Sequence, residues 1–253
     1  MTSSRPIERE LCDYTGESLD VVRERMGEGI HRTARLFLEY PGTMEAFYRE
    51  TDGYLYELSN NDDDPFVSYL AQKFGACMAG RRMLDYGCGI GVMAMKFAEA
   101  GLDVTACDVN GPSIGFLKHR VAARGWDTKL HVVEPDMALH PAEPYDLITC
   151  FHVLEHVATP RELLAALVTC LRPGGLFCGV APFDMIYDEF PEHIEAHRHL
   201  RLDSLCEEAG LEVKGRLVHN TYRDSDVVLV QAVKPVETGL HPKQPVMADN
   251  AAV

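Results

Sequence analysis

Between residues 82 and 235, short apolar runs alternate along the chain with segments of helix length, most of which close with glycine. Apolar runs of this length bounded by turn residues are typical of strands, and a glycine commonly ends a helix. Seven runs are predicted as strands: RMLDY (82–86), DVTACDV (103–109), KLHVVE (129–134), YDLITCF (145–151), LFCGVA (176–181), EVKGRLV (212–218) and DVVLVQAV (226–233).

The alternation of strands and helices predicts an α/β fold. Helices between strands allow parallel pairing, with one layer of helices on each face of the sheet. The last two runs differ because only the short segment HNTYRDS separates them. A connection this short requires antiparallel neighbours, so these two strands are predicted to form a hairpin at one edge of the sheet.

The two ends of the chain lack this alternation. Residues 1–75 show helical patterning with a break near Gly27 and Gly29, and they are predicted to form a helical cap. Residues 76–235 form the predicted sheet domain. Residues 236–253 contain two prolines, an alanine-rich end and few large apolar groups, so a disordered tail is expected there.

Composition restricts the possible partners. The net charge of −15 disfavours nucleic acid and anionic membrane surfaces, because phosphate groups would be repelled. No apolar run reaches 18 residues and the first residues lack a signal-peptide core, so a cytoplasmic protein is expected. The eight cysteines are scattered without a C-x-x-C pair, which favours reduced, buried thiols over a disulfide or zinc framework.

The segment LDYGCGIG (84–91) places glycines 87, 89 and 91 where the first strand must turn into a helix. Glycine tolerates positive φ and lets the backbone approach a ligand. The dinucleotide pattern G-x-G-x-x-G fails from Gly87 and fits only with Ala94 in the last place from Gly89. A phosphate loop also fails, because no Gly-Lys-Ser/Thr follows.

Two acids indicate what the glycine turn binds. Asp85 precedes the glycines and would repel a pyrophosphate, but it suits a ligand with an ammonium group. Asp108 ends the second strand, 19 residues after Gly89, where a carboxylate accepts hydrogen bonds from ribose hydroxyls. A ribose, a cationic amino-acid end and no phosphate together describe S-adenosylmethionine.

Five ordered motifs resemble class I S-adenosylmethionine-dependent methyltransferases, and most closely the small-molecule, quinone O-methyltransferase-like subgroup. The motifs are LDYGCGIG, the acid of the second strand, VVEPDM (132–137), YDLITCFHVLEHV (145–157) and LRPGGLFCGVAP (171–182), and RHLRLDSLCEEAGLEV (198–213) is similar to the subgroup's closing segment. The resemblance implies a doubly wound, Rossmann-like sheet of seven strands with the last strand antiparallel. It also implies that the cofactor is held by Asp85, Gly87, Gly89, Gly91, Asp108, Val109, Asp136, Met137 and Phe151.

His152, Glu155 and His156 spell H-x-x-E-H, which raises the possibility of a metal site. On a helix the two histidines would share a face, as in one class of zinc hydrolases. The resemblance favours a packed helix opening without metal, since V-L-E-H-V is common in this subgroup in members that bind none. His152 follows the fourth strand, where open α/β sheets hold their ligands, and is a candidate catalytic base or substrate contact.

Further candidates lie after the fifth strand and in the cap. His199 matches a histidine often found in the subgroup, and His193 and His197 are spaced four residues apart. Tyr54 belongs to a group of tyrosines in TDGYLYELSNN that would suit a lid over a sulfonium. Tyr54 and Tyr56 cannot share a helix face, so only one of them is expected to reach the site.

The predicted function is therefore methyl transfer to a small molecule, with oxygen preferred over nitrogen because histidines surround the expected acceptor site. His152, His199 and Tyr54 are the candidate catalytic residues, and no metal is expected. In an alternative within the same fold, S-adenosylmethionine itself is the alkylating substrate, in a cyclisation or aminocarboxypropyl transfer. A non-catalytic binding subunit is a third class, which the intact motifs disfavour.

Overall fold

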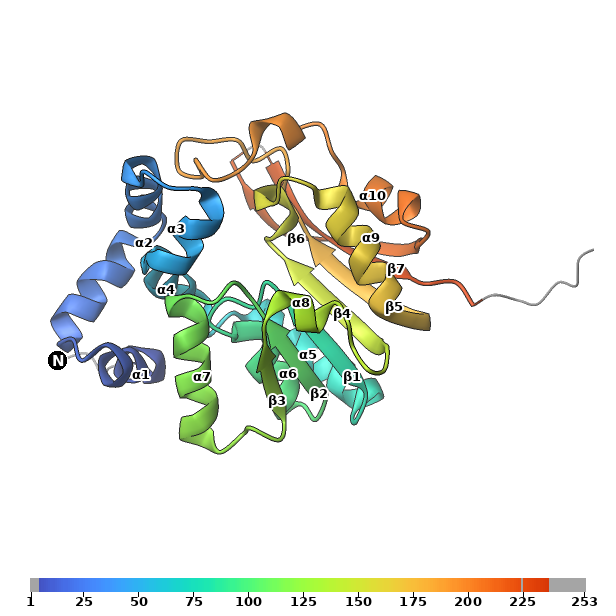
Figure 1. The fold of residues 1–253 in the computed structure, drawn as a ribbon, viewed down its shortest axis with the longest axis horizontal. Helices are drawn as coiled ribbons and strands as arrows, with labels where there is room; N and C mark the ends of the chain where they lie inside the picture. Colours follow the sequence, from blue (N-terminus) through green and yellow to red (C-terminus); the bar gives the residue numbers. More distant parts are fainter. Residues whose placement is uncertain (1–4, 224, 237–253) are drawn as a thin grey trace, which may run out of the picture.

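The computed structural model describes residues 5–223 and 225–236, and a seven-stranded sheet forms its centre (Figure 1). The strand order is β3-β2-β1-β4-β5-β7-β6. The strands are β1 Arg82–Tyr86, β2 Asp103–Cys107, β3 Leu130–Val133, β4 Tyr145–Phe151, β5 Leu171–Val180, β6 Glu212–Tyr222 and β7 Ser225–Val233. All seven predicted strands are present. The predicted disordered tail lies, after residue 236, outside the described residues.

The direction of the strands follows the prediction. β1 pairs in parallel with β2 and β4, and β5 pairs in parallel with β4. β7 is antiparallel to both β5 and β6, so the predicted hairpin is confirmed. The strand order reverses between β1 and β4. In open α/β sheets, ligands bind at the carboxyl ends of the strands next to such a reversal.

Helices cover both faces of the sheet, and each layer buries its own core. Helices α5 (Pro65–Met78), α6 (Val92–Glu99) and α7 (Pro112–Arg124) pack on one face, around Phe97 and Leu117. Helices α8 (Pro135–Ala138), α9 (Pro160–Cys170) and α10 (Leu202–Glu208) follow the other strands, and α9 and α10 bury Leu164 and Leu205 on the opposite face. Among the described residues, no helix combines the length and apolarity that crossing a membrane requires.

The first helices form a separate layer beside α7 (Figure 1). They are α1 (Pro6–Thr15), α2 (Leu19–Glu39), α3 (Met44–Glu50), α4 (Gly53–Leu58) and the 3-10 turn η1 (Ser59–Asn61). Together they are called the cap. Their apolar side chains bury Ile90 of the glycine turn and Phe116 of α7. Helix α5 instead packs in the main core, so the predicted boundary at residue 75 falls inside α5.

The break predicted in the longest cap helix is present at Gly29, whose φ of 49° and ψ of −128° are not helical. The positive φ explains the glycine, because a Cβ atom disfavours that region of the backbone map. The kink divides α2 into two arms. The first arm carries Val22 and Met26 into the core of the cap, and the second carries Thr33 toward α4.

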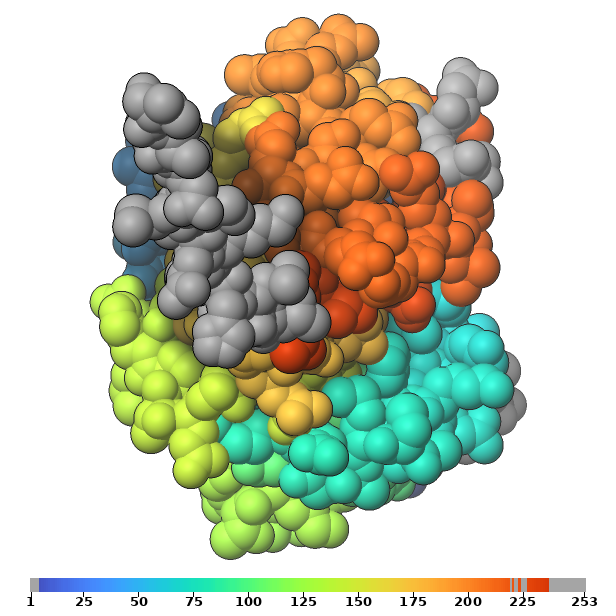
Figure 2. All heavy atoms as spheres, turned by 90° about the vertical axis from the view of Figure 1, so that its right-hand side faces the viewer, coloured from blue at the N-terminus to red at the C-terminus, as the bar shows by residue number. Residues whose placement is uncertain are grey.

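Strand β6 forms one edge of the sheet, on the side of the molecule that Figure 2 shows. An exposed edge strand can pair with another chain unless charges discourage it. Glu212, Lys214 and Arg216 alternate along β6 and are exposed. Arg216 also forms an ion pair with Asp203 of α10, which ties this edge to the helix layer.

A buried arginine joins the cap to the sheet domain. Arg120 of α7 donates to Glu10 of α1 and to Asp62 after η1, each at 2.7 Å. A third guanidinium nitrogen donates to the carbonyl oxygen of Ile90 at 3.2 Å. One side chain thus joins the first helix, the end of the cap and the glycine turn.

Replacing Arg120 with methionine should destabilise the protein strongly. The change removes the buried partner of Asp62 and one of the two arginine partners of Glu10, which keeps Arg124, and breaking a buried ion pair typically costs about 3–5 kcal/mol. Urea unfolding measures the loss. Arg49→Met is the matched control, because it removes only the exposed Arg49–Glu45 pair within α3, a type worth about 0.3–0.5 kcal/mol. Equal losses in the two variants would contradict the role given to Arg120.

Candidate functional site

The glycine turn connects β1 to α6 with three residues in the left-handed region. Gly87, Gly89 and Gly91 have φ values of 73°, 54° and 82°. The amides of Gly87 and Cys88 both donate to the carbonyl oxygen of Cys107 at the end of β2. The turn is therefore fixed to the neighbouring strand. The conformation explains why glycine occupies every second position.

Asp85 lies within β1, directly before this turn, and is only 3% exposed. Its Oδ1 accepts a hydrogen bond from the Thr149 hydroxyl at 2.8 Å. Its Oδ2 is buried and has no hydrogen-bond partner among the described residues. Burial raises the pKa of Asp85 to about 7. A buried carboxylate oxygen without a partner is a position where a cationic ligand group would be stabilised.

Asp108 follows β2 and faces the same turn. Its Oδ2 accepts from the amide of Gly89 and its Oδ1 from the amide of Val109, both at 2.7 Å. Burial raises the pKa of this carboxyl group, and the two amides oppose that effect. Each carboxylate oxygen has a further lone pair, so Asp108 can accept additional hydrogen bonds.

The other predicted cofactor residues lie at the same edge of the sheet. Asp136 and Met137 belong to the short helix α8 that follows β3, and both are exposed. Phe151 is the last residue of β4 and is half-buried. Because β1 to β4 are parallel neighbours, their carboxyl ends bring these residues to the edge that holds Asp85 and Asp108.

The H-x-x-E-H segment does not form the helix that would align its histidines. His152 has a φ of 55°, and only Leu154–His156 form a 3-10 turn, η2. The His152 amide donates to the carbonyl oxygen of Val180 at 2.8 Å, which ends β4 against β5. The exposed His152 ring lies 3.4 Å from Glu155, which is buried. The helical i, i+4 alignment of His152 and His156 is therefore wrong.

His156 instead meets His193, which lies in the segment after β5. Their ring centroids are 4.8 Å apart, and Nδ1 of His193 lies 2.7 Å from the carbonyl oxygen of Met185. Nδ1 of His156 is buried without a hydrogen-bond partner among the described residues, and burial lowers the pKa of His156 to about 4. Possible metal-ligand atoms of Glu155, His156 and His193 lie within 4.8 Å of one another. The group can therefore serve as a base or as a metal site.

The cap contributes two tyrosines to this group. Tyr48 and Tyr54 have ring centroids 5.3 Å apart, and they lie 6.1 and 6.5 Å from the centroid of His156. The Tyr54 hydroxyl donates to Oε1 of Glu192 at 2.7 Å. Tyr56 faces the other way and donates to Glu17. The different directions of Tyr54 and Tyr56 agree with their spacing on α4.

The cap also lies directly over the loops that follow β1 and β2. A Cβ atom on Gly89 would lie 2.5 Å from Cδ1 of Leu58, at the end of α4. A Cβ atom on Gly111 would lie 2.4 Å from the carbonyl oxygen of Tyr48. Gly111 is therefore needed for the cap backbone to approach this closely, and Leu58 of the cap packs directly on Gly89 at the carboxyl edge of the sheet.

Some residues of this group were not singled out from the sequence, and one predicted residue lies elsewhere. His199 is exposed and lies near His197, so the structure does not bring it to His156. Glu192 carries no distinguishing sequence signal, although His193 beside it is spaced four residues from His197. Leu58 gave no sequence signal at all, because its role is a contact with a distant glycine.

Comparison with known proteins identifies the family. A family model described as a methyltransferase domain matches residues 48–214. Over 105 residues the sequence is 33% identical to a ubiquinone biosynthesis O-methyltransferase of Bordetella avium, covering 41% of this chain and 44% of that protein. The chain spans less than half the length of the curated relatives it matches.

Solved structures show the same fold at low sequence identity. Magnesium protoporphyrin IX methyltransferase from Synechocystis PCC 6803, with bound SAM, has a TM-score of 0.54 at 14% identity, covering 92% of this chain and 100% of that one. The cyclase SpnF has a TM-score of 0.53 at 16% identity, covering 68% and 81%. The family model spans the cap tyrosines, the glycine turn and the histidines on a sheet of this fold, and the chain belongs to the class I S-adenosylmethionine-dependent methyltransferase family.

Proposed function

We propose that this protein transfers a methyl group from S-adenosylmethionine to a hydroxyl oxygen of a small molecule. The observation that carries the proposal is the half-buried His156 imidazole, which faces the cap tyrosines and whose buried Nδ1 has no hydrogen-bond partner among the described residues. With a pKa of about 4 it is neutral at pH 7 and can accept a proton. The names of the O-methyltransferase relatives support oxygen as the acceptor atom.

The residues at the carboxyl edge fit the cofactor. Asp85 offers a buried oxygen without a partner for the amino group, and the positive-φ glycines 87, 89 and 91 provide a close backbone surface. Asp108 and Val109 would hold the ribose end, and Asp136, Met137 and Phe151 the adenine end. When bound, S-adenosylmethionine supplies a methyl group on a positively charged sulfur, a carbon already activated for displacement.

The residues around His156 would move the proton of the acceptor. His156 would take it as the hydroxyl oxygen attacks, and the nearby Glu155 carboxylate would stabilise the resulting imidazolium. The pKa of Glu155 is lowered, because interactions with the neighbouring histidines outweigh the effect of its burial. Glu155 is therefore ionised at neutral pH and available for this role. His152 touches Glu155 and would position it rather than act as the base.

The cap would exclude water and orient the acceptor. Leu58 covers the glycine turn, the Tyr48 backbone lies against Gly111, and the Tyr54 ring contacts that of Tyr48 while its hydroxyl donates to Glu192 of the segment after β5. Aromatic faces attract a sulfonium, and a closed site favours attack by the positioned hydroxyl over side reactions with water. Tyr54 would thus position the acceptor, with its own hydroxyl occupied by Glu192.

The alternative reaction uses a different carbon of S-adenosylmethionine and releases methylthioadenosine. The fold does not decide between the two, because one fold can carry different reactions: structures named as a methyltransferase and as a [4+2]-cyclase match it with TM-scores of 0.54 and 0.53. The identity of the nucleoside product distinguishes the two reactions. We expect S-adenosylhomocysteine on chromatography after incubation with S-adenosylmethionine and a small-molecule extract of cells. Methylthioadenosine as the enzyme-dependent product would support the alternative.

Replacing Asp108 with alanine should weaken the binding of S-adenosylmethionine by about 1.5–3 kcal/mol, the scale of hydrogen bonds to a charged group. Titration calorimetry gives the affinity, and thermal melting checks that the variant is folded. Asp103→Ala is the matched control, because Asp103 is the first residue of the same strand and lies at its amino end, away from the carboxyl ends that form the site. Unchanged affinity in a folded Asp108 variant would remove this residue from the ribose site.

Replacing His156 with glutamine should lower kcat by about 100- to 10,000-fold, the usual contribution of a general base, while cofactor affinity stays nearly constant. His199→Gln is the control and should retain activity. Dialysis of the unmodified protein against a chelator should also leave kcat unchanged, since the proposed role of His156 needs no metal. Loss of activity on chelation, with recovery on adding one divalent ion, would instead make Glu155, His156 and His193 a metal centre.

A further inference from the structure

Two glutamates, the buried Glu192 and the half-buried Glu57, lie beside the proposed acceptor site, outside the proposed cofactor residues. Tyr54 and Glu57 are three residues apart and therefore lie on the same face of α4. Glu192, in the segment after β5, accepts a hydrogen bond from the Tyr54 hydroxyl with Oε1. Glu192 directly precedes His193, which contacts His156. The two glutamates thus lie on the cap side of the base, whereas the cofactor residues lie on β1 to β4.

Neither glutamate has a balancing positive charge. Oε2 of Glu57 and Oε2 of Glu192 are both buried and have no hydrogen-bond partner in the described part of the chain, and Glu192 is only 3% exposed. No arginine or lysine of the described residues forms an ion pair with either one. Burial raises the pKa of Glu57 to about 7, with Glu192 adding to the effect. Buried carboxylates are unfavourable unless a cation accompanies them.

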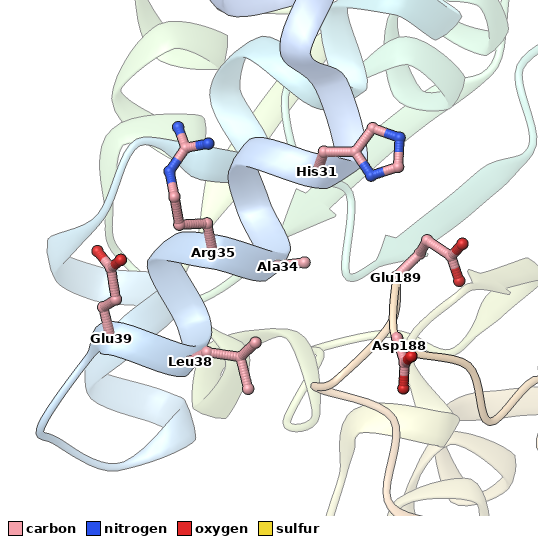
Figure 3. Close-up of a pocket in the computed structure, with 7 residues that line it drawn as sticks. All are labelled: His31, Ala34, Arg35, Leu38, Glu39, Asp188 and Glu189. Atoms are coloured by element: carbon pink, nitrogen blue, oxygen red, sulfur yellow. The ribbon is translucent and has the colours of Figure 1, made fainter.

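A hollow of about 400 Å³ opens between helix α2 and the segment after β5 (Figure 3). Helix α2 forms one wall, and Asp188 and Glu189 face it from the segment after β5. Ala34 lines the hollow next to Thr33, which faces α4, and Glu192 follows Glu189 by three residues. The hollow and Glu192 therefore share the segment after β5, although neither glutamate lines the hollow.

The charges around the hollow are also mainly negative. Its lining includes Glu39, Asp188 and Glu189 against one arginine, Arg35, and His31. Arg35 is paired with Glu28 at 3.1 Å and Glu189 with Arg223, which leaves Glu39 and Asp188 as the lining acids without an ion pair among the described residues. A concave surface lined by one sign of charge concentrates ligands of the opposite sign. The hollow and the two glutamates thus select for the same kind of ligand.

We infer that the acceptor carries a positively charged amine in addition to its hydroxyl, and that Glu192 and Glu57 bind this amine. The inference rests on the proposed function for the position of the hydroxyl, which faces His156. Each free Oε2 atom would accept a hydrogen bond from the ammonium group, which satisfies both carboxylates at once. Acceptors of this class are amino alcohols and amino phenols.

Binding of charge-matched probes to the protein loaded with S-adenosylhomocysteine tests the inference. One probe series is tyramine, 4-ethylphenol and 4-hydroxyphenylacetate, and the other is 5-aminopentanol, pentanol and 5-hydroxypentanoate. Each series keeps the hydroxyl and changes only the charge at the other end. We expect at least one amine to bind at least tenfold more tightly than its neutral counterpart, and the carboxylates to bind least. Calorimetry measures the affinities.

Three variants locate the effect. Glu192→Gln should abolish the preference for the amine, and Glu57→Gln should reduce it severalfold. Glu50→Gln is the matched control, because Glu50 also accepts a tyrosine hydroxyl, that of Tyr40 at 2.6 Å, but on the exposed surface of the cap. It should keep the full preference. Thermal melting verifies that the variants are folded.

Several outcomes would overturn the inference: no amine bound at millimolar concentration, neutral probes bound as tightly as amines, or a preference that survives in Glu192→Gln. The test involves no turnover, so it separates the two proposals. If the amine preference is found but no S-adenosylhomocysteine forms in the product assay, the proposed reaction fails and the cation site stands. If that product forms without an amine preference, only the cation site fails.

Discussion

The burial of Arg120 is the constraint on which the arrangement of the site depends. A guanidinium cannot lose its charge at neutral pH, so folding can bury it only if several acceptors converge on it. Here the acceptors come from both ends of the cap and from the glycine turn. The cap is thereby placed against the turn by a requirement for charge compensation, in addition to the apolar contacts of Ile90 and Phe116.

The position of the cap determines which polar groups remain without partners. With Leu58 over Gly89 and Tyr48 beside Gly111, the cap shields the strand ends from water. Asp85, Glu155 and Glu192 are each buried with an oxygen that has no hydrogen-bond partner among the described residues. The acceptors around Arg120 each receive a hydrogen bond from its guanidinium group. The acids with unpartnered oxygens lie elsewhere, at the carboxyl edge and beneath the cap. Buried polar atoms without hydrogen-bond partners that cluster in one place are typical of binding sites.

The sequence predicted the sheet well because its strands are encoded locally. RMLDY and YDLITCF agree with β1 and β4 to the residue, since their apolar runs are buried between two helix layers. The H-x-x-E-H segment was misjudged because its conformation is set by a backbone hydrogen bond from His152 to the neighbouring strand. The contact between Tyr54 and Glu192 joins residues 138 positions apart, and no local pattern could indicate it.

The same difference, between residues placed by local sequence and residues placed by long-range packing, separates the proposed cofactor residues from the proposed acceptor residues. Asp85, Asp108 and the glycines are placed by the sheet itself, and structures with different named reactions share that sheet. Tyr54, Glu57 and Glu192 are placed by the cap and by the segment after β5, which meet only through long-range packing. With the roles proposed for these residues, a change of acceptor requires changes in these two segments alone, because the proposed cofactor site depends on strand ends that they cover but do not build.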